Sequence, residues 1–233
     1  MTCDLDSHDT MCRALARRAD CIVVSVDYPL APEHPFPEGL DACWDVTTWL
    51  SRNGGDFGGD PLRLAVGGDS AGGNFAAVIA LRAREAHIAL SMQLLLYPIL
   101  DFRLDLPADA RVPITHGLSA EALHFYYRNY VPDGVDAHDP QISPFRASDL
   151  SGVAPAYIST CEFDPLLPEA EDYAQRLIRA GVPVTSRRYF GQIHGFARAT
   201  GVIEASWTAI ADAAHALRGS LLSDADIRAP QTE

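Results

Sequence analysis

Three side chains of this sequence have the types that nucleophilic catalysis by a serine requires. Ser70 is the centre of the stretch GDSAG (68–72), which fits the pattern G-x-S-x-G. A serine hydroxyl is a poor nucleophile at neutral pH, so it needs a base, and the base needs an acid that orients it. Asp164 ends an apolar run, and His194 comes just past a further predicted strand. Because the ends of parallel strands carry sites, we predict that His194 is the base and Asp164 the acid.

The glycines around Ser70 predict a sharp turn between a strand and a helix. An apolar run precedes the serine and an alanine-rich helical pattern follows it. In such a turn the central side chain projects above the sheet, and larger flanking side chains would collide with their neighbours. The backbone N–H of Ala71 then begins a helix and is predicted to stabilise an oxyanion. A plain glycine-rich turn or a helix cap is the alternative, whereas a phosphate-binding loop lacks its lysine.

Asp164 and His194 also have alternative interpretations. Asp164 precedes a proline and could simply cap the next helix. His194 is favoured among the eight histidines because it alone follows the last predicted strand in a glycine-flanked loop. Surface or structural places are predicted for the remaining histidines, namely His8, His34, His87, His116, His124, His138 and His215. No close pair of histidines has the spacing of a zinc site, so neither a metal nor another cofactor is predicted.

The elements that must position these residues alternate along the chain. Apolar runs predict strands at 21–28, 62–69, 91–100 and 154–164, and the first of them is predicted to be buried on both faces. A further strand is predicted at 184–190. Helical spacing predicts helices at 38–52, 71–86, 167–180 and 203–218. Repeated alternation of strand and helix predicts an α/β fold with a mainly parallel sheet.

One segment interrupts this alternation. Residues 101–146 contain prolines, polar turns and one amphipathic stretch, SAEALHFYYRNYV (119–131). We interpret them as an insertion between two strands that acts as a lid. The whole chain, 1–233, is otherwise predicted to be one domain that ends in a polar tail at 223–233.

The composition argues against several classes of partner and compartment. The 31 acidic and 18 basic residues give a net charge of −13, which repels phosphate backbones and anionic lipid. Nucleic acid is therefore not an expected partner. No apolar run is long enough to span a bilayer, and the N-terminus lacks the profile of a signal peptide, so a cytoplasmic location is predicted. Five cysteines without a C-x-x-C pair predict reduced thiols.

Several stretches together resemble one family, the bacterial hormone-sensitive lipase family of esterases within the α/β-hydrolases. GDSAGGN (68–74) resembles its nucleophile motif, DPL (164–166) its acid motif and HGF (194–196) its histidine motif. VSVDYPLAPEHPFP (24–37) and ISPFRA (142–147) resemble two further segments. The resemblance implies an α/β-hydrolase fold, with helices flanking the sheet and a cap insertion. It also implies a serine carboxylesterase that hydrolyses short-chain or aromatic esters through an acyl-enzyme intermediate.

One departure from the family concerns the oxyanion hole. The family carries an H-G-G-G motif shortly before the region that resembles DLDSHD (4–9), and no H-G-G occurs in this sequence. The resemblance therefore implies that the N-terminal part of the usual fold, with its first strands and most oxyanion donors, is missing. Three hypotheses follow: an internal start in a longer gene, a naturally shortened protein that repacks or pairs its strands between subunits, or a nonfunctional fragment.

These hypotheses leave more than one function open. A serine carboxylesterase acting on a small ester is the first. The alternative is a catalytically weak or inactive family member that binds a small molecule, because the oxyanion loop is absent. An amide- or lactone-cleaving hydrolase is a third, since the three residues do not define the leaving group. Exposed sheet edges also favour a homo-oligomer.

Overall fold

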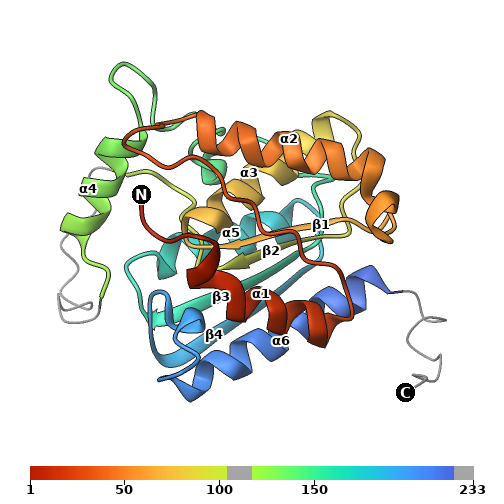
Figure 1. Ribbon diagram of the computed structural model, residues 1–233. Coiled ribbons are helices and arrows are strands. Elements are labelled where there is room, and N and C mark those ends of the chain that lie inside the picture. Colours follow the sequence, from red (N-terminus) through yellow and green to blue (C-terminus); the bar gives the residue numbers. More distant parts are fainter. Residues whose placement is uncertain (104–116, 223–233) are drawn as a thin grey trace.

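Residues 1–103 and 117–222 are described by a computed structural model, in which one parallel sheet lies between layers of helices (Figure 1). The strands are β1 (Ala65–Asp69), β2 (Met92–Leu96), β3 (Ala156–Phe163) and β4 (Val184–Ile193). They are hydrogen-bonded in the order β1-β2-β3-β4, and each pair is parallel. Their carboxyl ends therefore meet at one edge of the sheet.

Helices cover both faces of this sheet. Their bounds are α1 (Leu5–Ala19), α2 (Glu38–Asn53), α3 (Ala71–Glu85), α4 (Ala120–Tyr130), α5 (Leu167–Arg179) and α6 (Glu204–Leu221). Short 3₁₀ turns occupy Gly54–Phe57, Pro144–Arg146 and Phe196–Arg198. α1 and α6 pack on one face, α3 and α5 pack on the other, and α2 lies outside α3 (Figure 1).

The central strands are buried on both faces. Leu94 and Leu96 of β2 join the core cluster beneath α1 and α6, whereas Leu95 joins the cluster beneath α3 and α5. This is the alternation that a strand imposes on successive side chains. The apolar run of β2 is uninterrupted because side chains on both faces of the strand pack against helices. The predicted α/β fold with a mainly parallel sheet is confirmed.

Most predicted elements coincide with observed ones. The predicted strands after the first correspond to β1 through β4, and the predicted helices to α2, α3, α5 and α6. The sequence analysis missed α1, which begins with a reciprocal cap: Ser7 N–H donates to Asp4 Oδ1 at 2.8 Å, and Asp4 N–H donates to Ser7 Oγ at 3.0 Å. The signal was present, because Met11, Leu15 and Ala19 are buried at helical spacing.

The prediction of a buried strand at 21–28 is wrong. The segment runs past the sheet without joining it, and Ile22 and Val24 are 54% and 49% exposed. A cavity of about 900 Å³ lies between this segment and β1. The physical reason is that β propensity needs a neighbouring strand with which to pair, and the cavity stands where that neighbour would be.

The predicted insertion at 101–146 is only partly described. Residues 104–116 lie outside the described residues, and so does the predicted tail at 223–233. The amphipathic stretch forms α4, whose Leu123 and Tyr127 pack with Phe102 and Leu166. The backbone N–H of Phe36 donates to the Tyr130 carbonyl at 2.8 Å, which ties the proline-rich loop to α4. Action as a lid stays a prediction. Within the described ranges, none of the helices has the length and apolarity needed to cross a membrane.

Candidate active site

The structure brings the three residues singled out in the sequence into one hydrogen-bonded line. His194 Nε2 lies 2.8 Å from Ser70 Oγ, and His194 Nδ1 lies 2.7 Å from Asp164 Oδ2. Ser70 follows β1, Asp164 follows β3 and His194 follows β4. Three strand ends at the same edge of the sheet therefore supply a hydroxyl, an imidazole and a carboxylate. When Nδ1 carries the proton of the neutral imidazole, it donates to Asp164, and Nε2 is then able to accept the serine proton.

Ser70 sits in a strained turn that the neighbouring strand holds in place. Its backbone has φ 52° and ψ −113°, a combination that residues with a side chain rarely adopt. The Ser70 N–H donates to Leu96 O at 2.9 Å, and the Ser70 carbonyl accepts from Ile99 N–H at 3.2 Å. A Cβ on Gly68 would overlap the carbonyl group of Gly72. The turn therefore needs glycine at this position for steric reasons.

Replacing Gly68 by alanine is expected to destabilise the protein by about 2–3 kcal/mol or more, because backbone rather than a flexible side chain must move. Gly72→Ala is the matched control, since a Cβ there meets nothing within 4 Å and the residue lies in α3. The control is expected to leave stability unchanged or raise it by about 0.5–1 kcal/mol. Urea unfolding of both variants measures the effects, and equal effects would contradict the steric account.

Asp164 is held by its own loop as well as by His194. Its side chain is buried, and its Oδ1 accepts the Leu166 N–H at 2.9 Å. The carboxylate thus organises the turn before α5 and also faces the imidazole. The alternative interpretation of Asp164 as the cap of the next helix is wrong, because the N-cap of α5 is Leu166 and no side chain accepts a hydrogen bond there. The His194 ring lies edge-on against the Tyr97 ring, with 5.1 Å between centroids. Packing and hydrogen bonding together fix the orientation of the imidazole.

Ala71 begins α3 directly after the serine. The first N–H groups of a helix have no intrahelical partner and carry the positive end of the helix dipole. The Ala71 N–H is therefore one of the unpaired donors at the helix start beside Ser70, and its oxyanion role stays a prediction. Among the described residues, no group of three or more His, Cys, Asp or Glu side chains is arranged to hold a metal ion.

His8 has a partner that sequence reasoning did not find. The partner is Asp69, the residue directly before Ser70 in the chain. His8 Nε2 lies 2.9 Å from Asp69 Oδ1, and Arg198 Nε lies 3.6 Å from Asp69 Oδ2. The hydrogen bond to Asp69 raises the pKa of His8 above its ordinary 6.5, against the opposing effect of burial. Burial opposes ionisation of Asp69, but the hydrogen bond from His8 and the nearby positive charges outweigh it and lower the Asp69 pKa. α1 is thereby tied to the turn that carries the serine.

His8→Ala is expected to destabilise the protein by about 1–3 kcal/mol at pH 6, because a charged hydrogen bond is lost. The raised pKa of His8 means that its charge-dependent contribution is present below pH 6.5 and is lost as the pH rises through the folded-state pKa. The cost of the substitution should therefore be smaller at pH 9. His215→Ala is the control variant, because His215 is exposed and its removal should cost the same stability at both pH values. Equal costs of His8→Ala at both pH values would show that the charge contributes nothing.

Two further buried polar residues support the site. Asn74 Nδ2 donates to the carbonyls of Ile99 and Ile142 at 3.0 and 2.8 Å, which joins α3 to the loop after β2 and to the segment after α4. Glu169 is 5% exposed and accepts the Leu100 N–H at 2.7 Å. Burial raises the pKa of Glu169 to about 8. Sequence reasoning assigned no role to either residue, although Asn74 ends the GDSAGGN stretch.

A parallel sheet that presents a strained serine, with an imidazole and a carboxylate at neighbouring strand ends, is the arrangement of the α/β-hydrolases. The family model described as alpha/beta hydrolase fold matches residues 1–198. The chain belongs to this family.

Its similar relatives carry esterase names. Esterase LipI of Mycobacterium tuberculosis is 41% identical over 206 residues, which are 87% of this chain and 64% of LipI. Carboxylesterase NlhH of the same organism is 41% identical over 225 residues, which are 93% of this chain and 69% of NlhH. The chain thus spans about two thirds of the length of these relatives. The crystal structure of the carboxylesterase EstE1, from a metagenomic library, matches with TM-score 0.90 at 35% identity, over 95% of this chain and 76% of EstE1.

Proposed function

We propose that this chain forms the catalytic part of a carboxylic ester hydrolase of the hormone-sensitive lipase kind. Ser70 is the nucleophile, His194 the base and Asp164 the acid that orients the base. The observation that supports this assignment most strongly is the line of hydrogen bonds from Ser70 Oγ through His194 to Asp164, at 2.8 and 2.7 Å. The esterase names of relatives at 41% identity support the same reaction class.

The geometry suits an acyl-enzyme mechanism. Ser70 Oγ attacks the ester carbonyl carbon while His194 Nε2 takes the hydroxyl proton, and the carbonyl oxygen becomes an oxyanion beside the Ala71 N–H. The imidazolium returns the proton to the leaving alcohol as the C–O bond breaks. Water then attacks the acyl-enzyme with His194 again as base, which releases the acid and restores Ser70. Asp164, 2.7 Å from His194 Nδ1, holds the imidazole in place and stabilises the imidazolium that forms in each step.

The oxyanion site of these 233 residues is proposed to be incomplete. Ala71 supplies one donor, and the family resemblance places further donors in an H-G-G-G motif that this sequence does not contain. Removal of one such donor costs about 100- to 1000-fold in rate. The chain by itself is therefore expected to be a slow esterase, with small short-chain or aromatic esters as substrates.

Hydrolysis of p-nitrophenyl butyrate, together with covalent labelling by paraoxon, tests the proposed function. Turnover accompanied by a phosphoryl adduct on the peptide that contains Ser70 supports the assignment. Turnover that persists after complete labelling of Ser70 would contradict it, since the acyl group would then be carried elsewhere. A folded chain that neither turns over substrate nor takes the label favours the small-molecule binding alternative.

A further inference from the structure

The strand that leads to the catalytic histidine contains two extra residues near its carboxyl end. Cys161 of β3 lies opposite Tyr189 of β4. Two residues later in β3, Phe163 lies opposite Ile193, which comes four residues later in β4. One residue of β3 therefore faces three residues of β4, which we call the β4 bulge (190–192). Bulges are frequent next to active sites, where they redirect a side chain.

The β4 bulge decides which residue of β4 lies beside Asp164. Asp164 and His194 each come directly after the last residues of the β3–β4 pairing, so they continue the shifted register. In the register that precedes the bulge, Gln192 would take the place of His194. The imidazole would then lie two residues, or about 6–7 Å, further along the strand. The 2.7 Å contact between His194 Nδ1 and Asp164 Oδ2 therefore depends on the bulge.

A carboxylate of β3 binds the backbone of the bulge. The Gly191 N–H donates to Glu162 Oε2 at 2.7 Å, and Glu162 is the residue of β3 that faces the bulge. A hydrogen bond to a carboxylate is stronger than one between neutral groups. Gly191 has φ 73°, a left-handed conformation that glycine adopts without strain. Glu162 and Gly191 together stabilise the irregular path of β4 before His194.

A second carboxylate beside β4 has a different contact. Glu171 of α5 binds a side chain of the strand, because its Oε1 lies 2.8 Å from Arg188 Nε. That hydrogen bond raises the pKa of Arg188, and the charge of Glu162 adds to the effect. The two glutamates thus share one electrostatic neighbourhood, but Glu162 holds the main chain of the bulge whereas Glu171 holds a side chain before it.

We propose that Glu162 is a positioning residue, whose carboxylate holds the β4 bulge and thereby places His194 beside Asp164. It acts through the Gly191 N–H and not on the substrate. Because a misplacement of about 1 Å can cost about 100-fold in rate, the bond affects catalysis from outside the reacting groups. The catalytic consequence rests on the proposed function, whereas the arrangement of the His194–Asp164 pair can be measured without any turnover.

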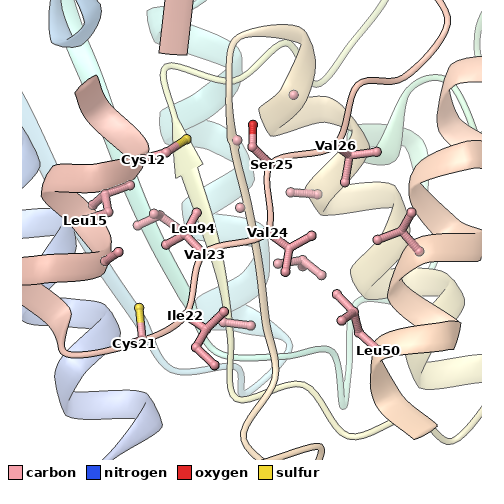
Figure 2. A pocket seen from close by; sticks show the side chains of 18 of the residues that line it. Cys12, Leu15, Cys21, Ile22, Val23, Val24, Ser25, Val26, Leu50 and Leu94 are labelled. Atoms are coloured by element: carbon pink, nitrogen blue, oxygen red, sulfur yellow. The ribbon is translucent and has the colours of Figure 1, made fainter. Parts of the chain in front are cut away.

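The bulge is separate from the large cavity beside β1. That cavity lies along the first strand of the sheet, whereas β4 is the last of the four described strands in the sheet order. Figure 2 shows that apolar side chains such as Leu15, Val24 and Leu50 enter it. Glu162 and the bulge are not among the described residues that line it. Variants of Glu162 therefore leave the lining of the cavity unchanged.

The first test measures which ring nitrogen of His194 carries the proton. Long-range ¹H–¹⁵N NMR spectra at pH 9 distinguish the two neutral tautomers, and comparison with His194→Ala assigns the signals. We expect the Nδ1–H tautomer in the wild type and in Glu162→Gln, whose amide oxygen still accepts the Gly191 N–H. Glu162→Ala is expected to lose this preference. An unchanged tautomer in Glu162→Ala, or its loss in both variants, would overturn the proposal, as would its absence from the wild type.

The second test is hydrolysis of p-nitrophenyl butyrate. Glu162→Ala is expected to lower kcat by about fivefold or more and to leave KM within about twofold, because the base is displaced while the substrate surface is kept. Glu162→Gln should restore kcat to within about twofold of the wild type. Glu171→Ala is the matched control and is expected to keep the wild-type kcat. A smaller loss in Glu162→Ala, or an equal loss in the control, would contradict the role of the bulge.

Gly191→Ala tests the bulge from its other side and carries the test if Glu162→Ala does not fold. A Cβ on Gly191 meets nothing within 4 Å, so the substitution acts only through the positive φ. We expect the same change of tautomer and of kcat, and a double variant no slower than the slower single variant. Losses that multiply would show that the two residues do not act through one structure, and would overturn the proposal.

The two readouts separate this proposal from the proposed function. A tautomer change in Glu162→Ala, in a chain that hydrolyses no ester, would support the positioning of His194 while the esterase assignment failed. Ester hydrolysis that depends on Ser70, with neither kcat nor the tautomer altered in Glu162→Ala, would overturn the positioning role alone.

Discussion

Ser70→Ala is expected to lower kcat for p-nitrophenyl butyrate by about 10⁴-fold or more, or to the uncatalysed background if that is reached first. The substitution removes Ser70 Oγ, which lies 2.8 Å from His194 Nε2. Among the described residues, no other hydrogen-bond partner of this nitrogen is present. KM should change little, because the substrate-binding surface is retained. Exposed Ser151 offers a control, and Ser151→Ala is expected to hydrolyse the ester at the wild-type rate.

The same assay tests whether Ser70 and His194 act as one unit. If the proton of Ser70 passes to His194, the double variant Ser70→Ala/His194→Ala should be no slower than either single variant. Losses that multiply would mean that the two residues act independently. Wild-type hydrolysis by Ser70→Ala would remove the nucleophile assignment altogether.

Glu169→Gln is expected to make the protein much more stable than the wild type at high pH. Burial raises the pKa of Glu169 from its ordinary 4.5 to about 8. The unfolded chain releases this proton above pH 4.5, whereas the folded protein keeps it until about pH 8, so stability falls across that window. At 1.36 kcal/mol per pH unit the loss is at most about 5 kcal/mol. Glutamine cannot ionise and escapes this loss.

Urea unfolding at pH 5, 7 and 9 measures the effect. The advantage of Glu169→Gln should be small at pH 5, grow by several kcal/mol toward pH 8, and stay constant at higher pH. Glutamine can still accept the Leu100 N–H that Glu169 accepts at 2.7 Å, so the hydrogen bond is preserved. Exposed Glu85 supplies the control, Glu85→Gln, for which stability curves parallel to the wild type are expected. Parallel curves for Glu169→Gln would mean that the buried carboxyl ionises normally.

The sequence by itself determined the features that depend on local order. Glycines around Ser70 identified the turn, since only residues without a side chain fit there, as the overlap at Gly68 confirms. Continuous apolar runs identified β2 and β3, because strands covered on both faces need apolar side chains at every position. Asp164 could be chosen because it ends such a run, and His194 because it follows the last predicted strand in a glycine-flanked loop. The structure brings both within hydrogen-bond distance of their expected neighbours.

Only the tertiary structure decided what depends on distant partners. Residues 21–28 have the composition of a buried strand but form none, because none of the described strands lies beside them to pair with their backbone. His8 meets Asp69 across 61 positions of the chain, and no local pattern marks that contact. The burial that raises the pKa of Glu169 likewise comes from packing of α5 against the sheet. Local sequence expresses propensity and periodicity, whereas pairing, burial and charge neighbours arise only when remote segments meet.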